Sequence, residues 1–181
     1  VHDMGVSREN LALMRRFADE GRLPLRIDAY ADGDSGALAD LCEHGLYRHD
    51  GGRLQMTGVK LFMDGALGSR GARMLAPYAD APGTRGLWAT EPRSIGKDAA
   101  RVLRAGYQPA VHAIGDAANR AALEFLARAR RSMDALLPRV EHAQIVDPKD
   151  ALGFGRAGLA ASVQPMHMAD DHAWTPARLG P

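Results

Sequence analysis

The sequence has few of the features that mark secreted, membrane-spanning or nucleic-acid-binding proteins. Cys42 is the single cysteine among 181 residues, so no internal disulfide can form. No apolar run approaches the roughly 20 residues that a membrane-spanning helix needs. Charge of one sign never dominates, because 23 basic side chains stand against 22 acidic ones. These absences argue against a nucleic-acid or membrane partner and indicate a cytoplasmic protein.

The chain has the apolar content of one ordinary domain, at 46% hydrophobic residues. It begins Val1-His2-Asp3, with neither an initiator Met nor the pattern of a signal peptide. We therefore expect it to be cut from a longer protein.

Segments typical of strands alternate with helical patterns along the whole chain. Asp147 followed by Pro148 predicts a helix start, and Gly158 predicts its end. We expect helices over 7–20, 35–45, 94–104, 116–129 and 147–158, with Ser7, Ser35, Ser94, Asp116 and Asp147 as caps, and strands over 23–31, 58–64, 108–114, 139–146 and 159–165.

Strands separated by single helices favour a parallel sheet, in one of two architectures. A doubly wound sheet usually carries a Gly-rich phosphate turn, and no strand here ends in one. A (β/α)₈ barrel instead places polar residues at the C-terminal ends of several strands. The sequence does so at Asp28, Asp32, Lys60, Asp64, His112, Asp116, His142, Gln144, Gln164 and His167. We therefore expect an α/β fold that forms part of such a barrel.

The segment 65–92 is rich in glycine and proline and too long for an ordinary connection. We interpret it as a functional loop and expect it to act as a mobile lid.

Lys60 is the first candidate for chemistry. Strand alternation places Lys60, Phe62 and Asp64 on one face. A lysine in a parallel strand is either solvated at the rim of the sheet or takes part in the chemistry of a site. In a barrel interior, loss of solvation would lower its pKa, and the neutral amine could react with carbon dioxide to form a metal-bridging carbamate.

His112 and His142 each lie near the end of an apolar strand, and imidazole is the commonest neutral metal ligand. Either one alone is more often a core histidine, but the pair beside Lys60 favours a metal site. Substrate contacts are expected from Asp64, Arg70, Gln144, Gln164 and His167. Each of these also has an ordinary structural explanation, such as a cap or a solvated side chain.

At these motifs the sequence resembles the YtcJ-like branch of the amidohydrolase superfamily, which includes N-substituted formamide deformylases. The resemblance rests on four segments and the C-terminal Arg178-Leu179-Gly180-Pro181. The four segments are Val59-Lys60-Leu61-Phe62 with 64–71, Val111-His112-Ala113-Ile114-Gly115-Asp116 with Asn119-Arg120, Arg139-Val140-Glu141-His142-Ala143-Gln144, and Ser162-Val163-Gln164-Pro165.

The resemblance implies a barrel, holding roughly strands 2 to 7 here, with one or two divalent ions, zinc first among them. It implies hydrolysis of non-peptide carbon–nitrogen bonds in a small amide-type substrate. Lys60 would be the fourth-strand lysine, carbamylated where two metals bind, and His112 and His142 would be the fifth- and sixth-strand ligands. Val1-His2-Asp3 would be the end of the second strand.

Two family features are missing from this sequence, which has no His-x-His pair and no eighth-strand aspartate. We therefore expect this chain alone to be inactive, and expect its open barrel edges to favour association, including homo-oligomers. The alternative functions are a non-catalytic scaffold or, less favoured, a metal-free enzyme that uses Lys60 as an imine-forming nucleophile.

Overall fold

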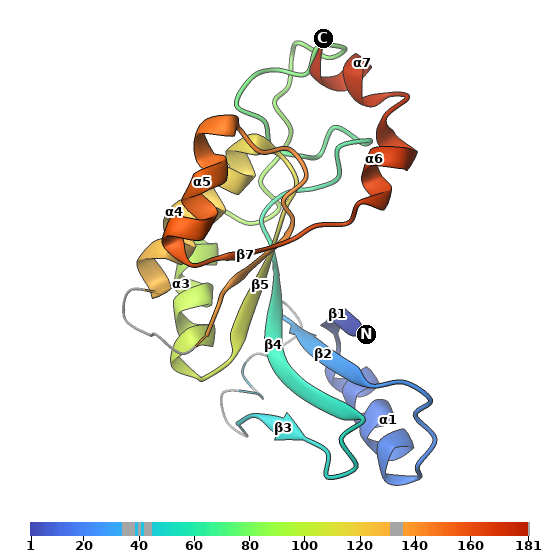
Figure 1. Ribbon diagram of the computed structural model, residues 1–181. Coiled ribbons are helices and arrows are strands. Elements are labelled where there is room, and N and C mark those ends of the chain that lie inside the picture. The colour runs from blue at the N-terminus through green and yellow to red at the C-terminus, as the bar shows by residue number, and fades with distance from the viewer. Residues whose placement is uncertain (34–38, 40, 42–44, 131–135, 181) are drawn as a thin grey trace.

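The computed structural model describes residues 1–33, 39, 41, 45–130 and 136–180 (Figure 1). Most of the helix predicted over 35–45, with its cap Ser35, lies outside the described residues. The elements are β1 (His2–Val6), α1 (Arg8–Asp19), β2 (Ile27–Asp32), β3 (Tyr47–Arg48), β4 (Leu54–Phe62), α3 (Pro92–Arg104), β5 (Gln108–Ala113), α4 (Asp116–Arg130), β6 (Arg139–His142), α5 (Pro148–Ala157), β7 (Ala160–Ser162), α6 (Met166–Asp171) and α7 (Thr175–Leu179).

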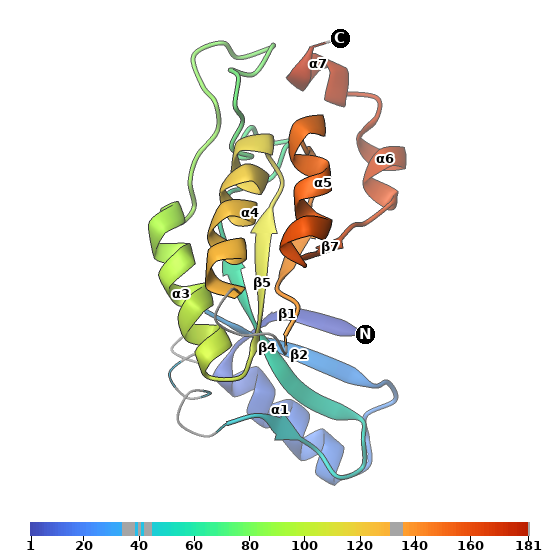
Figure 2. The same cartoon turned by 60° about the vertical axis from the view of Figure 1, so that its left-hand side comes forward.

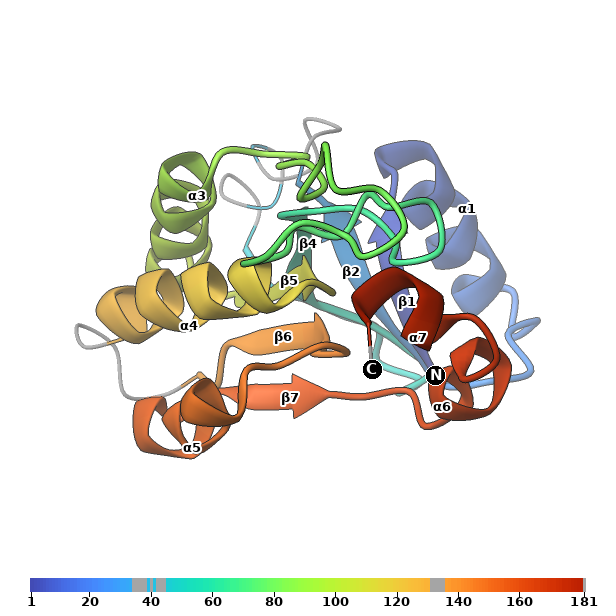
Figure 3. The same ribbon diagram turned by 90° about the horizontal axis from the view of Figure 1, so that it is seen from above.

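The strands form one open sheet in the order β1-β2-β4-β5-β6-β7, in which every neighbouring pair is parallel. The short β3 pairs antiparallel with the start of β4. Seen from above, helices α1, α3, α4 and α5 lie outside an arc of strands (Figure 3). This is the arrangement of a partial (β/α)₈ barrel, and it brings the C-terminal ends of the parallel strands to one side.

The main core lies between the strands and the outer helices. Val59, Val111 and Val140 on three neighbouring strands are fully buried. Ala99 of α3 and Leu126 of α4 pack into the same cluster. Burial of these apolar faces holds the strand ends in a fixed geometry, since protein interiors are closely packed.

Three predicted helix signals are confirmed. The Ser7 hydroxyl accepts a hydrogen bond from the Asn10 N–H at 3.3 Å, and the Asp147 carboxylate accepts one from the Lys149 N–H at 2.9 Å. Gly158 ends α5 with a left-handed φ of 62°.

Ser94 does not cap α3. That helix begins two residues earlier at Pro92, and Glu91 stands in the cap position without a side-chain hydrogen bond. Proline is favoured in the first turn because it has no N–H to leave unpaired.

Several strand boundaries differ from the prediction. β1 is a full strand rather than a short stub, β2 begins only after Pro24, and β4 begins at Leu54. β6 ends at His142, because His142 and Ala143 have φ values of 74° and 41°, which no strand can continue through. β7 covers only three residues, and the hairpin strand β3 and the helices α6 and α7 had no clear sequence signal.

Residues 65–91 form a long connection that has its own apolar cluster. Leu67, Met74 and Tyr78 are buried against Ile114. The Tyr78 hydroxyl donates to the Ala72 carbonyl at 2.6 Å. The predicted lid motion therefore remains a proposal, and opening the segment would require these contacts to break.

No helix in the described part of the chain is long and apolar enough to span a bilayer.

Candidate metal and active site

His112 and His142 lie next to each other at the C-terminal ends of β5 and β6. The strand register aligns Ala113 with His142, and the two imidazole centroids are 4.6 Å apart at 71°. The sheet topology brings the two strand ends to the same side. The left-handed φ of 74° at His142 interrupts the strand alternation that would otherwise place its side chain on the opposite face from His112.

The His112 ring is neutral and has an unused nitrogen. Burial first, then the neighbouring charges of His142 and Lys60, lower its pKa to about 4, while a hydrogen bond with the Gly65 backbone acts in the opposite direction. Its Nε2 atom is buried without a hydrogen-bond partner, although Asp64 Oδ1 lies 3.4 Å away. A buried lone pair without a partner is costly unless something else binds it.

Gln164 orients the His142 ring. Its side-chain N–H₂ donates to the Ser162 carbonyl at 3.0 Å, so its oxygen faces the imidazole. His142 Nδ1 lies 2.7 Å from that oxygen and donates to it, which leaves Nε2 as the free lone pair. The pKa of His142 is lowered, mainly by burial, which keeps the ring neutral.

Lys60 lies on β4, one inward-facing level below these rings. The register aligns Lys60 with Ala110 and Phe62 with His112. The side chain is 4% exposed. Burial lowers the pKa of its amine to about 8, against the opposing effect of Glu141, while Arg139 lowers it further. A part of the amine is therefore neutral near physiological pH, as a carbamate or an imine would require.

Glu141 lies close enough to Lys60 to raise the pKa of its amine, and it is ion-paired with Arg139. Its carboxylate accepts from Arg139 at 2.8 Å, and Arg139 also reaches Ser162 at 2.9 Å. Both side chains of this ion pair are largely buried.

A metal ion would find two suitable ligand atoms here. The nitrogens of His112 and His142 fit, because one is buried without a partner and the other is freed by Gln164. Within the described ranges, no group of three His, Cys, Asp or Glu side chains comes together as a complete ligand set. Lys60 is a further candidate ligand on this side of the sheet, and its role depends on modification.

Asp64 ties the long loop to the end of β5. Its carboxylate accepts N–H bonds from Arg73 at 2.9 Å, Ile114 at 3.0 Å and Gly115 at 2.9 Å. Burial raises its pKa to about 6 although these three hydrogen bonds act to lower it. With its oxygens engaged in this way, Asp64 shapes the backbone beside His112, and direct contact with substrate stays a prediction.

Asn119 is a structural residue of the site that the sequence interpretation did not single out. It is fully buried on α4, and its amide nitrogen contacts four carbonyl oxygens at 3.0–3.2 Å. Three belong to residues 113–115 after His112, and the fourth belongs to Ile145 after His142. One side chain thus fixes both strand ends. Its sequence signals were its place near the start of a predicted helix and the Asn119-Arg120 segment of the family resemblance, neither of which indicates this role.

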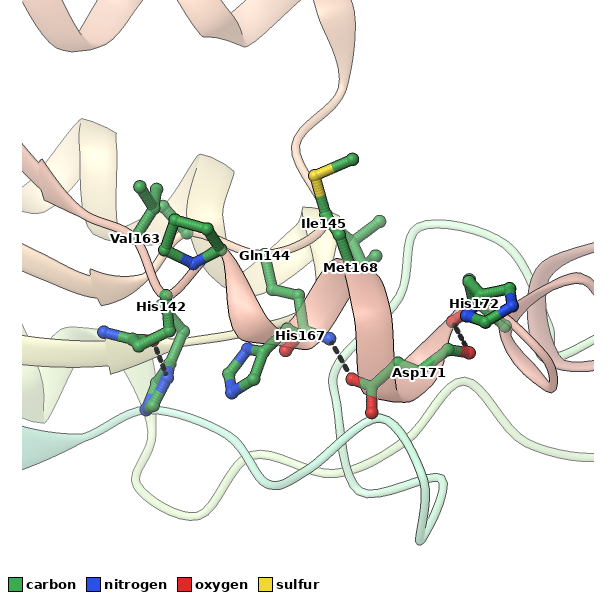
Figure 4. Close-up of a pocket in the computed structure, with 12 residues that line it drawn as sticks. His142, Gln144, Ile145, Val163, His167, Met168, Asp171 and His172 are labelled. Carbon is green, nitrogen blue, oxygen red and sulfur yellow. Dashed lines mark hydrogen bonds between the residues drawn. The ribbon is translucent and has the colours of Figure 1, made fainter.

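A pocket of about 460 Å³ opens beside His142 (Figure 4). His167 of α6 lies on its wall, with its ring stacked 5.6 Å from that of His142. The Gln144 amide donates to Asp171 at 2.8 Å, so it is held away from the rings. The remaining wall is largely apolar, with Ile145, Val163, Pro165 and Met168 among its residues.

Arg70 does not join this group. Its guanidinium makes a two-bond ion pair with Asp80, at 2.9 Å for both bonds. Arg178 of α7 also contacts Asp80 and donates to the Gly68 carbonyl at 3.1 Å. Arg70 therefore joins two parts of the loop, while Arg178 fastens the loop to the C-terminal helix, and contact of Arg70 with an anionic substrate stays a prediction.

The geometry agrees with the comparison to known proteins, where the model of the amidohydrolase family matches residues 2–181. The chain belongs to the amidohydrolase family. A protein of known structure, described as an uncharacterized metal-dependent hydrolase from Pyrococcus furiosus, has 32% identity and a TM-score of 0.89, and the match covers 100% of this chain and 37% of that one.

Two further relatives support membership in the amidohydrolase family. Protein LONG AFTER FAR-RED 3 of Arabidopsis thaliana is 39% identical over 130 residues, 70% of this chain and 22% of that protein. Putative amidohydrolase YtcJ of Bacillus subtilis (strain 168) is 32% identical over 135 residues, 75% of this chain and 25% of that protein. The chain thus spans 22% to 37% of the length of these relatives.

Proposed function

We propose that this chain contributes part of the active site of a metal-dependent hydrolase that cleaves non-peptide carbon–nitrogen bonds in small amide-type substrates. The observation that carries the proposal is the pair of neutral imidazoles, His112 and His142, whose ring centroids lie 4.6 Å apart at the ends of neighbouring strands, with His112 Nε2 buried without a hydrogen-bond partner. Membership in the amidohydrolase family and the likeness to a metal-dependent hydrolase support it.

The roles of the residues follow from their contacts. His112 and His142 would bind a divalent ion, for which zinc is the first candidate because it accepts imidazole ligands. Such an ion supplies activated water and polarises a carbonyl oxygen. Gln164 holds one ligand in the correct tautomer. The apolar pocket beside His142 and His167 would receive the substituent of the substrate.

Lys60 is proposed as a carbamylated third ligand. Its amine would attack carbon dioxide, form the nitrogen–carbon bond and release one proton, and the anionic carbamate that results would be the ligand group. The lowered pKa of about 8 supports this reaction. The same lowered pKa also suits the alternative of an imine with a carbonyl substrate, which borohydride trapping on Lys60 would reveal.

The test measures zinc binding to the purified chain by calorimetry, with elemental analysis as a second readout. We expect weak binding, lost in His112→Ala and in His142→Ala and kept in His49→Ala, whose ring lies in the distant β3–β4 turn. Metal analysis of the intact parent protein tests the scaffold alternative, because a stoichiometric ion would favour the enzyme and the absence of one would favour a scaffold role.

We also propose that the chain alone does not turn over N-acyl or N-formyl amines, since a catalytic zinc site needs a third ligand and a proton acceptor. Clear turnover that His112→Ala abolishes would contradict this part of the proposal.

A further inference from the structure

A groove of about 530 Å³ runs between helices α3 and α4 on the outer surface, away from the strand ends. The two helices lie side by side there (Figure 2). Its floor is formed by Gly96, Ala100 and Ala129, with the half-buried ring of Phe125 beside them. A Cβ atom at Gly96 would lie 2.7 Å from the Phe125 ring, so glycine is what keeps the ring and the groove in this position.

Cationic side chains line the rim of this groove: Arg93, Lys97 and Arg104 from α3, and Arg128 from α4. The three on α3 are exposed, and none has an ion pair within the described part of the chain. Arg128 pairs with Glu124 on its own helix. Positions 93, 97 and 104 fall on one helical stripe, about 16 Å long at the rise of an α-helix.

This row is electrostatically unfavourable for the helix itself. Arg93 and Lys97 are like charges four residues apart, which repel each other on a helix surface. Arg93 also lies in the first turn of α3, near the positive end of the helix dipole, which Glu91 at the cap position offsets in part, whereas Arg104 lies in the last turn, where a cation is favourable. An anionic partner along the groove would relieve both effects.

We propose that the α3–α4 groove binds an acidic segment of a partner protein, with carboxylates on the cationic row and one apolar side chain on the floor beside Phe125. The length of the row suits an extended chain with several carboxylates, and arginine binds carboxylates through paired hydrogen bonds. A phosphate at the start of α3 is disfavoured, because Glu91 stands in the cap position.

Nucleic acid fits less well than an acidic peptide. Asp98 and Glu124 interrupt the positive surface on these helices, and the whole chain has a net charge of +1. Nucleic-acid affinity comes mostly from many phosphate contacts, which four cations do not supply.

The test uses fluorescence anisotropy with a labelled Glu-rich peptide that has a central leucine, and with its Gln counterpart. We expect the acidic peptide to bind, with an affinity that falls as the salt concentration rises, and the Gln peptide not to bind. Arg93→Glu with Lys97→Glu should weaken binding at least about tenfold. The matched double reversal Arg85→Glu with Arg156→Glu, at exposed positions elsewhere, should change it less than about twofold.

A second variant tests the contribution of the groove floor separately from that of the cationic side chains. Ala100→Leu fills the groove and leaves every cation in place, and we expect it to weaken the acidic peptide as well. Circular dichroism and thermal unfolding confirm that each variant keeps its fold.

Several outcomes would overturn the proposal. The docking surface would be refuted by any of three results: equal binding of the two peptides, equal losses of affinity in the two double reversals, or no binding of the acidic peptide up to about 1 mM. If a single-stranded oligonucleotide or inorganic phosphate bound the same residues more tightly than the acidic peptide does, the proposed protein partner would be wrong.

Discussion

Replacing Gln164 by leucine should weaken zinc binding without disturbing the fold. The leucine keeps the volume of the side chain but removes the oxygen that lies 2.7 Å from His142 Nδ1. Without that acceptor, the ring can place its proton on Nε2, the atom proposed as the metal ligand.

The expected size of this effect follows from the geometry. One hydrogen bond has a net value of about 0.5–1.5 kcal/mol, or roughly a two- to tenfold change in an equilibrium. Partners that orient metal-binding histidines typically change metal affinity by about 10- to 100-fold. Because His142 is only half-buried, we expect the overlap of the two ranges, about a tenfold loss.

Zinc titration followed by NMR of the imidazole signals measures this loss even when binding is weak. Without zinc, the ¹⁵N signals of His142 should report a proton on Nδ1 in the unaltered chain and a mixed state in Gln164→Leu. Gln164→Glu keeps an acceptor and should bind at least as well as the unaltered chain. Gln144→Leu is the matched control, since Gln144 contacts Asp171 rather than a histidine.

The reasoning would be refuted if Gln164→Leu and Gln144→Leu bound zinc equally while the His142 tautomer stayed unchanged. A different result would show that the metal site itself is wrong and not the role of Gln164: His142→Ala would then have no effect on zinc binding.

Three other predictions concern stability. Asn119→Ala should lower the free energy of unfolding by about 2 kcal/mol, because two amide hydrogens shared among four carbonyls are lost. The midpoint temperature of thermal unfolding should drop by about 4–8 °C. Asn10→Ala, at an exposed position, serves as the control. Asp147→Ala should lower the unfolding midpoint by removing the cap of α5. The pKa of Asp147 is lowered, mainly by a hydrogen bond from the Lys149 backbone N–H. Its charge therefore contributes stability above pH 3.8, the ordinary pKa of the group, and this contribution is lost as the pH falls through the lowered pKa. Chemical unfolding curves at several pH values measure it. Asp80→Asn should speed proteolysis within residues 65–91, because it weakens the ion pair that fastens the loop.

Each of these has a clear opposing result. An Asn119→Ala midpoint equal to that of Asn10→Ala would show that the carbonyls find other donors. A pH-independent difference for Asp147→Ala would leave the cap without a charge contribution, and unchanged proteolysis of Asp80→Asn would show that the apolar cluster alone holds the loop.

The sequence was sufficient for the parallel fold and for the two histidines. Alternation of strands and helices is a long-range pattern that survives errors of a few residues at each boundary. It therefore placed His112 and His142 near equivalent points of successive units, where the structure brings their rings together.

The parts that the sequence did not predict depend on contacts between distant segments. Gln164 hydrogen-bonds a neighbouring ring and Asp64 accepts from the backbone at residues 73, 114 and 115, and their contact with substrate stays a prediction. The early end of β6 depends on left-handed φ values at two residues other than glycine, which no local propensity indicates. Arg70 is an ordinary basic loop residue until folding brings Asp80 beside it.

The Asp64 carboxylate also has a consequence for the order of folding. It joins Gly115 across 51 positions of the chain, and it can do so only after the intervening loop and α3 have closed on the sheet. Contacts that close long loops lose chain entropy before they gain energy, so they tend to form late. We therefore expect the backbone around His112 to be among the last parts to assemble and the first to open, so that amide hydrogens at residues 114 and 115 exchange faster than those in the middle of β5.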